Sequence, residues 1–215
     1  MFLHSRILSR LPFQRRFYTP RHAPRPTDLS AYLVRAADKD PNTNVQRGTR
    51  FEFCTQTALM QHFGMQLKHY GGRGDGGIDL RGIWPLSDLI HHSLPSTMAL
   101  FVQCKDHQKG VSPEHIRSLI GAMVSQQDPN HLGIGILASP YTQKGFTRQV
   151  IRAFDATHIP LGLAIIDGLD VTELVFNEAA KDAMPGVDVT RRFLPNQNTS
   201  EPIMTFNGRP VPIVN

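Results

Sequence analysis

Cysteine is scarce in this 215-residue sequence, and long apolar runs are missing. The two cysteines, Cys54 and Cys104, each fall in an apolar pattern, which indicates small core residues in a reducing compartment. Their spacing matches no zinc site. Glycine or a polar residue interrupts every apolar run within about ten positions, which excludes a membrane-spanning helix. The sequence therefore predicts a soluble chain.

Acidic residues are absent from the first 25 positions, which contain six arginines. This composition, with apolar residues at helical spacing between the arginines, predicts a mitochondrial presequence over residues 1–25, and an RNA-binding basic tail is the alternative. The rest of the chain has 17 basic and 18 acidic residues. A uniformly basic surface is thereby excluded, so any nucleic-acid-binding surface must be a local patch.

The length allows one domain with a sizeable core, together with extensions. Residues 26–47 are expected to be a linker with a short helix, and residues 48–184 the domain itself. Residues 185–215 are rich in proline and asparagine and offer few periodic apolar positions, so we expect an extension that wraps the domain or stays mobile and that the core does not need.

Periodicity and punctuating residues predict the elements of the domain. Early strands joined by a glycine turn favour antiparallel hairpins, whereas the later alternation of strands and helices favours parallel pairing. The sequence thus predicts an α/β fold with a mixed central sheet flanked by helices. The expected helices are 50–63, closed by Gly64, one from Ser112, and 142–154; the expected strands are 65–70, 78–84, 98–105, 132–138 and 161–166.

An acid, an amide and a lysine lie at the ends of two of these strands. Side chains at i and i+2 of a strand project from one face, so we expect Gln103 and Lys105 to point together and Cys104 to point to the opposite layer. If the strands pair, the Asp79 carboxylate reaches the same patch. Mg²⁺ prefers oxygen ligands, which Asp79, the Gln103 amide and the Cys104 carbonyl would supply. The alternative is a glycine turn followed by solvated strand ends.

The words GGRGDGGIDL (71–80), VQCK (102–105) and VSPEHIRSLIGA (111–122) resemble the Mrr-like branch of the PD-(D/E)XK, or restriction-endonuclease-like, nuclease superfamily. The resemblance implies a restriction-endonuclease-like fold and makes Asp79, Gln103 and Lys105 catalytic. It adds Glu52, which stands in the helix word GTRFE (48–52). It also implies that Asp79, Gln103 and Glu52 hold Mg²⁺ or Mn²⁺, while Lys105 orients or deprotonates water or neutralises charge on the phosphorane.

This sequence departs from the superfamily pattern in two places. Gln103 replaces the central acid, as is usual in the Mrr-like branch, and is a weaker metal ligand than a carboxylate. Residues 84–97 lengthen the connection between two strands and predict a flap or a long hairpin end; their His91 and His92 are interpreted as a polar loop. Without the resemblance, Glu52 would be interpreted as a partner of the helix dipole.

The leader, the length and the proline-rich tail are similar to the fungal Required for respiratory growth protein 7 family. That resemblance implies a protein of the mitochondrial matrix that is needed for respiratory growth and maintains mitochondrial DNA. The sequence thus predicts a metal-dependent endonuclease acting on nucleic acid, with DNA as the partner. An inactive nucleic-acid-binding module and a structural assembly factor are the alternatives. Loop 139–148, with Lys144 and Arg148, is a second candidate for phosphate contact, and the oligomeric state stays open.

Overall fold

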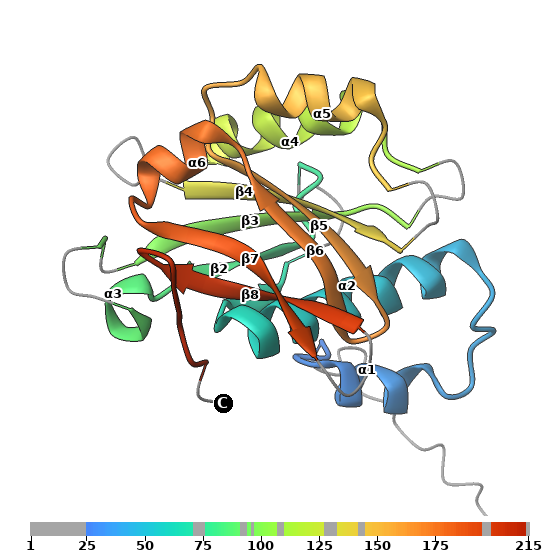
Figure 1. Ribbon diagram of the computed structural model, residues 1–215. Coiled ribbons are helices and arrows are strands. Elements are labelled where there is room, and N and C mark those ends of the chain that lie inside the picture. Colours follow the sequence, from blue (N-terminus) through green and yellow to red (C-terminus); the bar gives the residue numbers. More distant parts are fainter. Residues whose placement is uncertain are drawn as a thin grey trace, which may run out of the picture.

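The computed structural model describes residues 25–70, 76–90, 94–95, 97–106, 110–126, 133–141, 145–194 and 199–213. Within these ranges the chain forms two sheets and a set of helices packed around them (Figure 1). The helices are α1 (Leu29–Ala36), α2 (Asn44–Phe63), α3 (Leu86–Leu89), α4 (Pro113–Gln126), α5 (Arg148–Asp155) and α6 (Glu178–Ala183). The strands are β1 (Gln66–His69), β2 (Leu80–Trp84), β3 (Met98–Cys104), β4 (Gly133–Pro140), β5 (Leu161–Asp167), β6 (Asp170–Phe176), β7 (Val187–Leu194), β8 (Thr199–Phe206) and β9 (Arg209–Pro210).

The larger sheet is mixed, as the sequence predicts. Its six strands lie in the order β1-β2-β3-β4-β5-β6. Strands β1, β2 and β3 pair antiparallel, β3, β4 and β5 pair parallel, and β6 returns antiparallel along β5. The parallel pairs follow from the crossover helices α4 and α5, because a parallel connection has to return the chain to the same end of the sheet. The sequence patterns did not predict β6.

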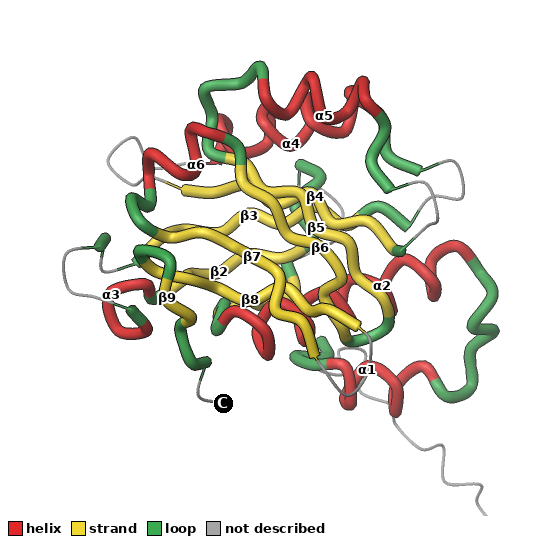
Figure 2. The backbone as a smooth tube through the Cα atoms, viewed as in Figure 1, coloured by secondary structure: helices red, strands yellow, loops and turns green. Residues whose placement is uncertain are grey.

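Helices cover both faces of this sheet, as Figure 2 shows. On one face, α2 and the second sheet enclose an apolar cluster that includes Leu59, Leu80, Val102 and Met204. On the other face, α4 and α5 enclose a cluster that includes Phe101 and Leu119. Neighbouring residues of β3 therefore enter different clusters, which is the expected alternation for a central strand buried on both faces.

Helix α2 is longer at its start than predicted. It begins at Asn44 because the Thr43 side chain accepts a hydrogen bond from the Gln46 N–H, at 3.3 Å. It ends as predicted at Gly64, whose φ of 67° lies in the left-handed region that glycine adopts without strain. Glu52 consequently lies in the third turn of the helix and not in the first. The interpretation of Glu52 as a helix-dipole partner is therefore wrong.

The helix predicted from residue 142 also begins elsewhere. Helix α5 starts at Arg148 because Thr147 caps it, accepting a hydrogen bond from the Val150 N–H at 3.4 Å. Residues 142–144 lie outside the described part of the chain, and so does Lys144 with them. Arg148, the other cation of the proposed phosphate-contacting loop, is exposed in the first turn of α5.

The segment after residue 185 packs on the domain. It forms the second sheet, in which β7 pairs with β8 and β8 with β9, all antiparallel. Val187 and Met204 are buried in the same cluster as Ala58 and Leu59 of α2. Of the two expected alternatives, the described residues of this segment wrap the domain, and their buried apolar side chains count against the expectation that the core does not need it.

Several sequence interpretations fall on residues outside the described ranges. The predicted presequence does so for residues 1–24, and so do residues 71–75 of the glycine-rich word and the pair His91 and His92. The lengthened connection before β3 contains α3 and is described only in part. Among the helices that the structure does describe, none has both the length and the apolar character needed to cross a membrane.

Candidate active site

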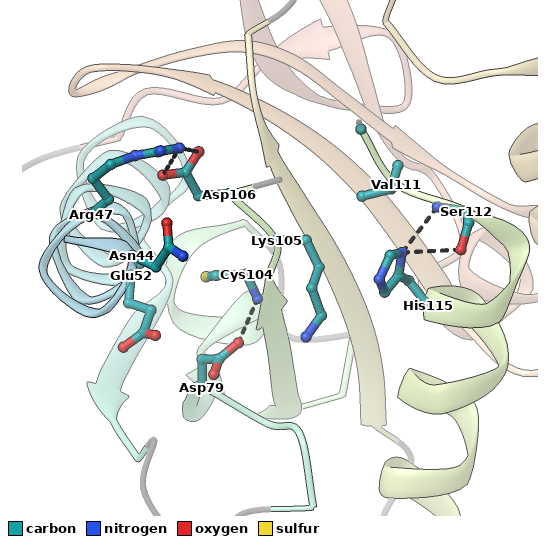
Figure 3. Close-up of a pocket in the computed structure, with 12 residues that line it drawn as sticks. Asn44, Arg47, Glu52, Asp79, Cys104, Lys105, Asp106, Val111, Ser112 and His115 are labelled. Carbon is teal, nitrogen blue, oxygen red and sulfur yellow. Dashed lines mark hydrogen bonds and ion pairs between the residues drawn. The ribbon is translucent and has the colours of Figure 1, made fainter. Parts of the chain in front are cut away.

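A cavity of about 770 Å³ lies where β3 ends, between the first turns of α2 and the start of α4 (Figure 3). Three of the four predicted site residues, Glu52, Asp79 and Lys105, line it. Gln103 is not among its lining residues. The remaining lining residues are Asn44, Arg47, Gly48, Cys104, Asp106, Gly110, Val111, Ser112 and His115. The carboxyl end of a strand at such a position is a common place for a site in α/β proteins.

Asp79 is held firmly at the entrance to β2. Its N–H donates to the Val102 carbonyl at 2.9 Å, and its own carbonyl accepts the Tyr70 N–H at 2.7 Å. Its carboxylate Oδ2 accepts the Cys104 N–H, also at 2.7 Å. The backbone of β3 thus orients the carboxylate, and a bond from a neutral donor to an ionised acceptor is one of the stronger kinds.

Lys105 follows the last residue of β3. Its N–H donates to the Ala138 carbonyl at 2.9 Å, which fixes its backbone against β4, and its side chain lines the cavity. Cys104 packs against the apolar cluster on the α2 side of the sheet, together with Val102, as the alternation predicts, and its residue also lines the cavity.

Gln103 instead connects β3 to the glycine turn. Its side chain is buried, and its Nε2 donates to the Gly77 carbonyl at 2.7 Å. Gly77 has a φ of 88°, and a Cβ at this position would lie 2.7 Å from that nitrogen, so a glycine is required here. The Gln103 Oε1 is buried and has no hydrogen-bond partner among the described residues. That Gln103 is a metal ligand stays a prediction.

Glu52 contacts His69, a residue that no sequence motif singles out. Its Oε2 lies 2.5 Å from Nε2 of His69 on β1. The His69 ring stacks on Phe53, with centroids 4.6 Å apart and an interplanar angle of 13°. Both partners of the pair are largely buried. The alternation of β1 is the one signal that would have found His69, since it places this residue with Leu67 on the side that faces α2.

The charges around the cavity act on the thiol between them. Burial raises the pKa of Cys104 well above its ordinary value, and the negative charges of Asp79 and Glu52 raise it further. These surroundings favour the protonated thiol, which is a poor nucleophile. At the rim, Arg47 forms an ion pair with Asp106, at 3.2 Å.

One histidine, His115, lines the cavity from the side of α4. Nδ1 of His115 accepts the Ser112 N–H at 2.9 Å, which satisfies a donor at the start of the helix. Ser112, Pro113 and Glu114 predict this helix start from the sequence, but no sequence pattern assigns a role to His115. Its position in the first turn, next to a predicted cap, was the available signal.

The oxygen atoms of the cavity suit a hard metal ion. In the described part of the chain no group of three or more His, Cys, Asp or Glu side chains is placed to hold a metal. The cavity does present the two carboxylates of Asp79 and Glu52. The Gln103 Oε1, which has no hydrogen-bond partner among the described residues, belongs to the residue just before Cys104, and Cys104 lines the cavity. Two carboxylates with a shell completed by water are typical of Mg²⁺ sites, so the donor set fits Mg²⁺ or Mn²⁺.

Comparison with known proteins identifies relatives that match 87% and 66% of this chain. A mitochondrial, otherwise uncharacterised protein of Schizosaccharomyces pombe is 27% identical over 214 residues, which span 87% of this chain and 82% of the relative. The Required for respiratory growth protein 7 of Kluyveromyces lactis, also named mitochondrial, is 28% identical over 175 residues, 66% of this chain and 73% of the relative. No solved structure matches. The family model of Required for respiratory growth protein 7 matches residues 43–99 and 90–190. The chain therefore belongs to the Required for respiratory growth protein 7 family.

Proposed function

We propose that the cavity at the end of β3 is the active site of a metal-dependent nuclease with a restriction-endonuclease-like fold of the Mrr-like branch. One observation supports this most strongly. Glu52, Asp79 and Lys105 come from α2, from the turn before β2 and from the end of β3, and all three line one cavity. Residues so far apart in sequence have no local reason to meet, whereas phosphodiester hydrolysis requires acids and a cation together.

Each side chain has a distinct part in this chemistry. Asp79 and Glu52 are the residues that hold Mg²⁺ or Mn²⁺; when bound, the ion supplies a Lewis acid for the phosphoryl oxygen and lowers the pKa of a water. His69 orients Glu52 through their 2.5 Å contact. The Lys105 ammonium orients the attacking water and stabilises the negative charge that develops on the phosphorane oxygens.

The names of the relatives support a place of action. Both relatives are named mitochondrial, and one is named for respiratory growth. The first 25 residues of this chain contain six arginines and no acid, as mitochondrial presequences do. We infer that the protein acts in the mitochondrial matrix, that its substrate is mitochondrial DNA, and that respiratory growth depends on it.

A second candidate function is a nucleic-acid-binding module without catalysis. Two of the four expected catalytic side chains favour it, because protein partners already engage them. Glu52 contacts His69, and the amide of Gln103 donates to the Gly77 carbonyl. In this alternative the acids and Lys105 maintain the fold and the binding surface but no longer hydrolyse a phosphodiester.

Incubation of the full chain with supercoiled DNA, linear DNA and RNA distinguishes the two functions. Cleavage is expected with Mg²⁺ or Mn²⁺ and is expected to stop with EDTA. Lys105→Ala should slow cleavage by orders of magnitude and change nucleic-acid affinity by about one phosphate contact, because the ammonium acts mainly on the transition state.

Lys181→Ala is the matched control, because Lys181 is an exposed lysine of α6 that pairs with Glu178. Its cleavage rate should equal that of the wild type. Cleavage by Lys105→Ala at the wild-type rate, or no cleavage of any substrate with either metal, contradicts the nuclease proposal. Binding without cleavage would then favour the module.

A further inference from the structure

One side of the β1–β2 hairpin is open to solvent. We call it the β1–β2 outer face and define it by Gln66, Lys68, Tyr70, Arg81 and Ile83. Tyr70 is 45% exposed and Ile83 39% exposed, and Gln66 and Lys68 are exposed as well. The residues between them point to the other side of the sheet, where Leu67, Leu80 and Trp84 are buried against α2. Alternation therefore puts a polar and aromatic set on the uncovered side.

The five residues of the β1–β2 outer face include two neighbouring cations, and the acid nearest to them in the register is Asp79, opposite Tyr70. Lys68 lies directly opposite Arg81 in the antiparallel pair of β1 and β2. Like charges at opposite positions destabilise a sheet. Neither side chain forms an ion pair with any residue that the structure describes. Because the chain after the leader is nearly neutral, these two charges form a local basic patch that an anionic partner would complement.

Arg81 is held in place by two aromatic rings. Its guanidinium carbon lies 4.7 Å from the ring centroid of Tyr70 and 5.1 Å from that of Phe101. Phe101 is the residue of β3 that pairs with Arg81. A cation positioned over ring faces is oriented before any ligand binds, so less side-chain entropy is lost on binding. The exposed part of the Tyr70 ring stays available to a ligand.

This face leads to the candidate active site. The Tyr70 N–H donates to the carbonyl of Asp79 at 2.7 Å, so the exposed ring and the candidate metal carboxylate belong to paired residues. We propose that the β1–β2 outer face binds single-stranded nucleic acid, with phosphates on Lys68 and Arg81 and a base stacked on Tyr70, next to Asp79. Bases of a duplex are stacked on each other, so an exposed ring selects unpaired ones.

The placement of the nucleic-acid strand next to a catalytic site at Asp79 rests on the proposed function, but the binding of nucleic acid to this face does not. The affinity is measured by fluorescence anisotropy in EDTA, with a labelled single-stranded DNA oligonucleotide and with its duplex, on the full chain. Tyr70→Ala should weaken binding to the single strand about ten-fold and leave duplex binding unchanged. Tyr70→Phe keeps the ring and should bind as the wild type does.

The salt dependence tests the two cations. Each of Lys68→Gln and Arg81→Gln should lower the slope of log K against log salt concentration by about 0.7, the value for one phosphate of a single strand. If Tyr70→Ala fails to fold, as its thermal unfolding will show, these two slopes decide the question. The arginines of the leader add the same background to every variant.

Two control variants remove similar side chains elsewhere. Phe193→Ala removes a β7 side chain that is 77% exposed, and Lys181→Gln removes a cation of α6, next to the opposite edge strand β6. Both should bind as the wild type does. The proposal is overturned if folded Tyr70→Ala binds the single strand as tightly as the wild type, or if it loses affinity equally for single strand and duplex. It is also overturned if both cation variants keep the wild-type salt slope, which is the result expected if this face binds a protein partner. Weakened binding together with no cleavage would sustain this proposal and refute the nuclease.

Discussion

Replacing Asp79 by asparagine should separate its structural role from its chemical role. The carboxylate accepts the Cys104 N–H at 2.7 Å and also lines the candidate active site. Asparagine keeps an acceptor oxygen of similar reach but loses the charge, whereas alanine loses both. Asp79→Asn should therefore keep most of the stability and lose cleavage, and Asp79→Ala should lose both.

The expected magnitudes follow from the type of hydrogen bond. A partly buried bond to a charged acceptor contributes about 1.5–3 kcal/mol, and a neutral one about 0.5–1.5 kcal/mol. Asp79→Ala should thus cost about 2 kcal/mol and Asp79→Asn about 1 kcal/mol. For a chain of this size the midpoint of thermal unfolding should fall by about 4–8 °C and 2–4 °C, respectively. Both variants should cleave at least about a hundred-fold more slowly. A hundred-fold is roughly the largest loss of activity expected when only a hydrogen-bond partner of a metal ligand is removed, so the loss of the ligand itself should reach or exceed it.

Urea and thermal unfolding measure the stability, and cleavage of supercoiled DNA with Mg²⁺ measures the activity. Cleavage at the wild-type rate by Asp79→Asn would refute the assignment of the carboxylate to a metal. Equal stability of Asp79→Ala and the wild type would refute the structural part. If Asp79→Asn is as unstable as Asp79→Ala, the charge and not the acceptor geometry stabilises this end of β3.

Three further variants test other parts of the structure. Gln103→Glu puts a carboxylate oxygen against the Gly77 carbonyl in place of the amide donor, so the free energy of unfolding in urea should fall by about 2 kcal/mol. This loss should shrink at acid pH, where a protonated glutamic acid donates again. A loss of stability that does not depend on pH would contradict this explanation. Asn177→Ala removes the acceptor of the Leu161 N–H and the donor to the Ile159 carbonyl, each at 2.9 Å. The free energy of unfolding should therefore fall by about 2–4 kcal/mol. A change under about 1 kcal/mol would show that water replaces both hydrogen bonds. A chain ending at Leu194 lacks β8 and with it the buried Met204, so its urea unfolding should lose cooperativity or shift to lower urea, and an unchanged transition would show that the second sheet is dispensable.

Local signals in the sequence predict the element boundaries best. Gly64 ends α2 and Pro113 begins α4 as predicted, because a left-handed glycine and a proline in the first turn act through their own backbone. The strands of the larger sheet up to β5 follow from alternation in β1 and from apolar runs of a few residues in the others. Their parallel and antiparallel pairing follows from whether a turn or a helix connects them.

The sequence by itself thus determined the mixed sheet, and its motifs singled out Glu52, Asp79 and Lys105, which share one cavity. Only the tertiary structure decided that Gln103 turns to Gly77 and that His69 contacts Glu52. Those contacts join residues far apart in sequence, and their geometry depends on how α2 and the glycine turn pack on the sheet. Periodicity describes which face a residue shares within one element, but it contains no information on which other element will lie against that face.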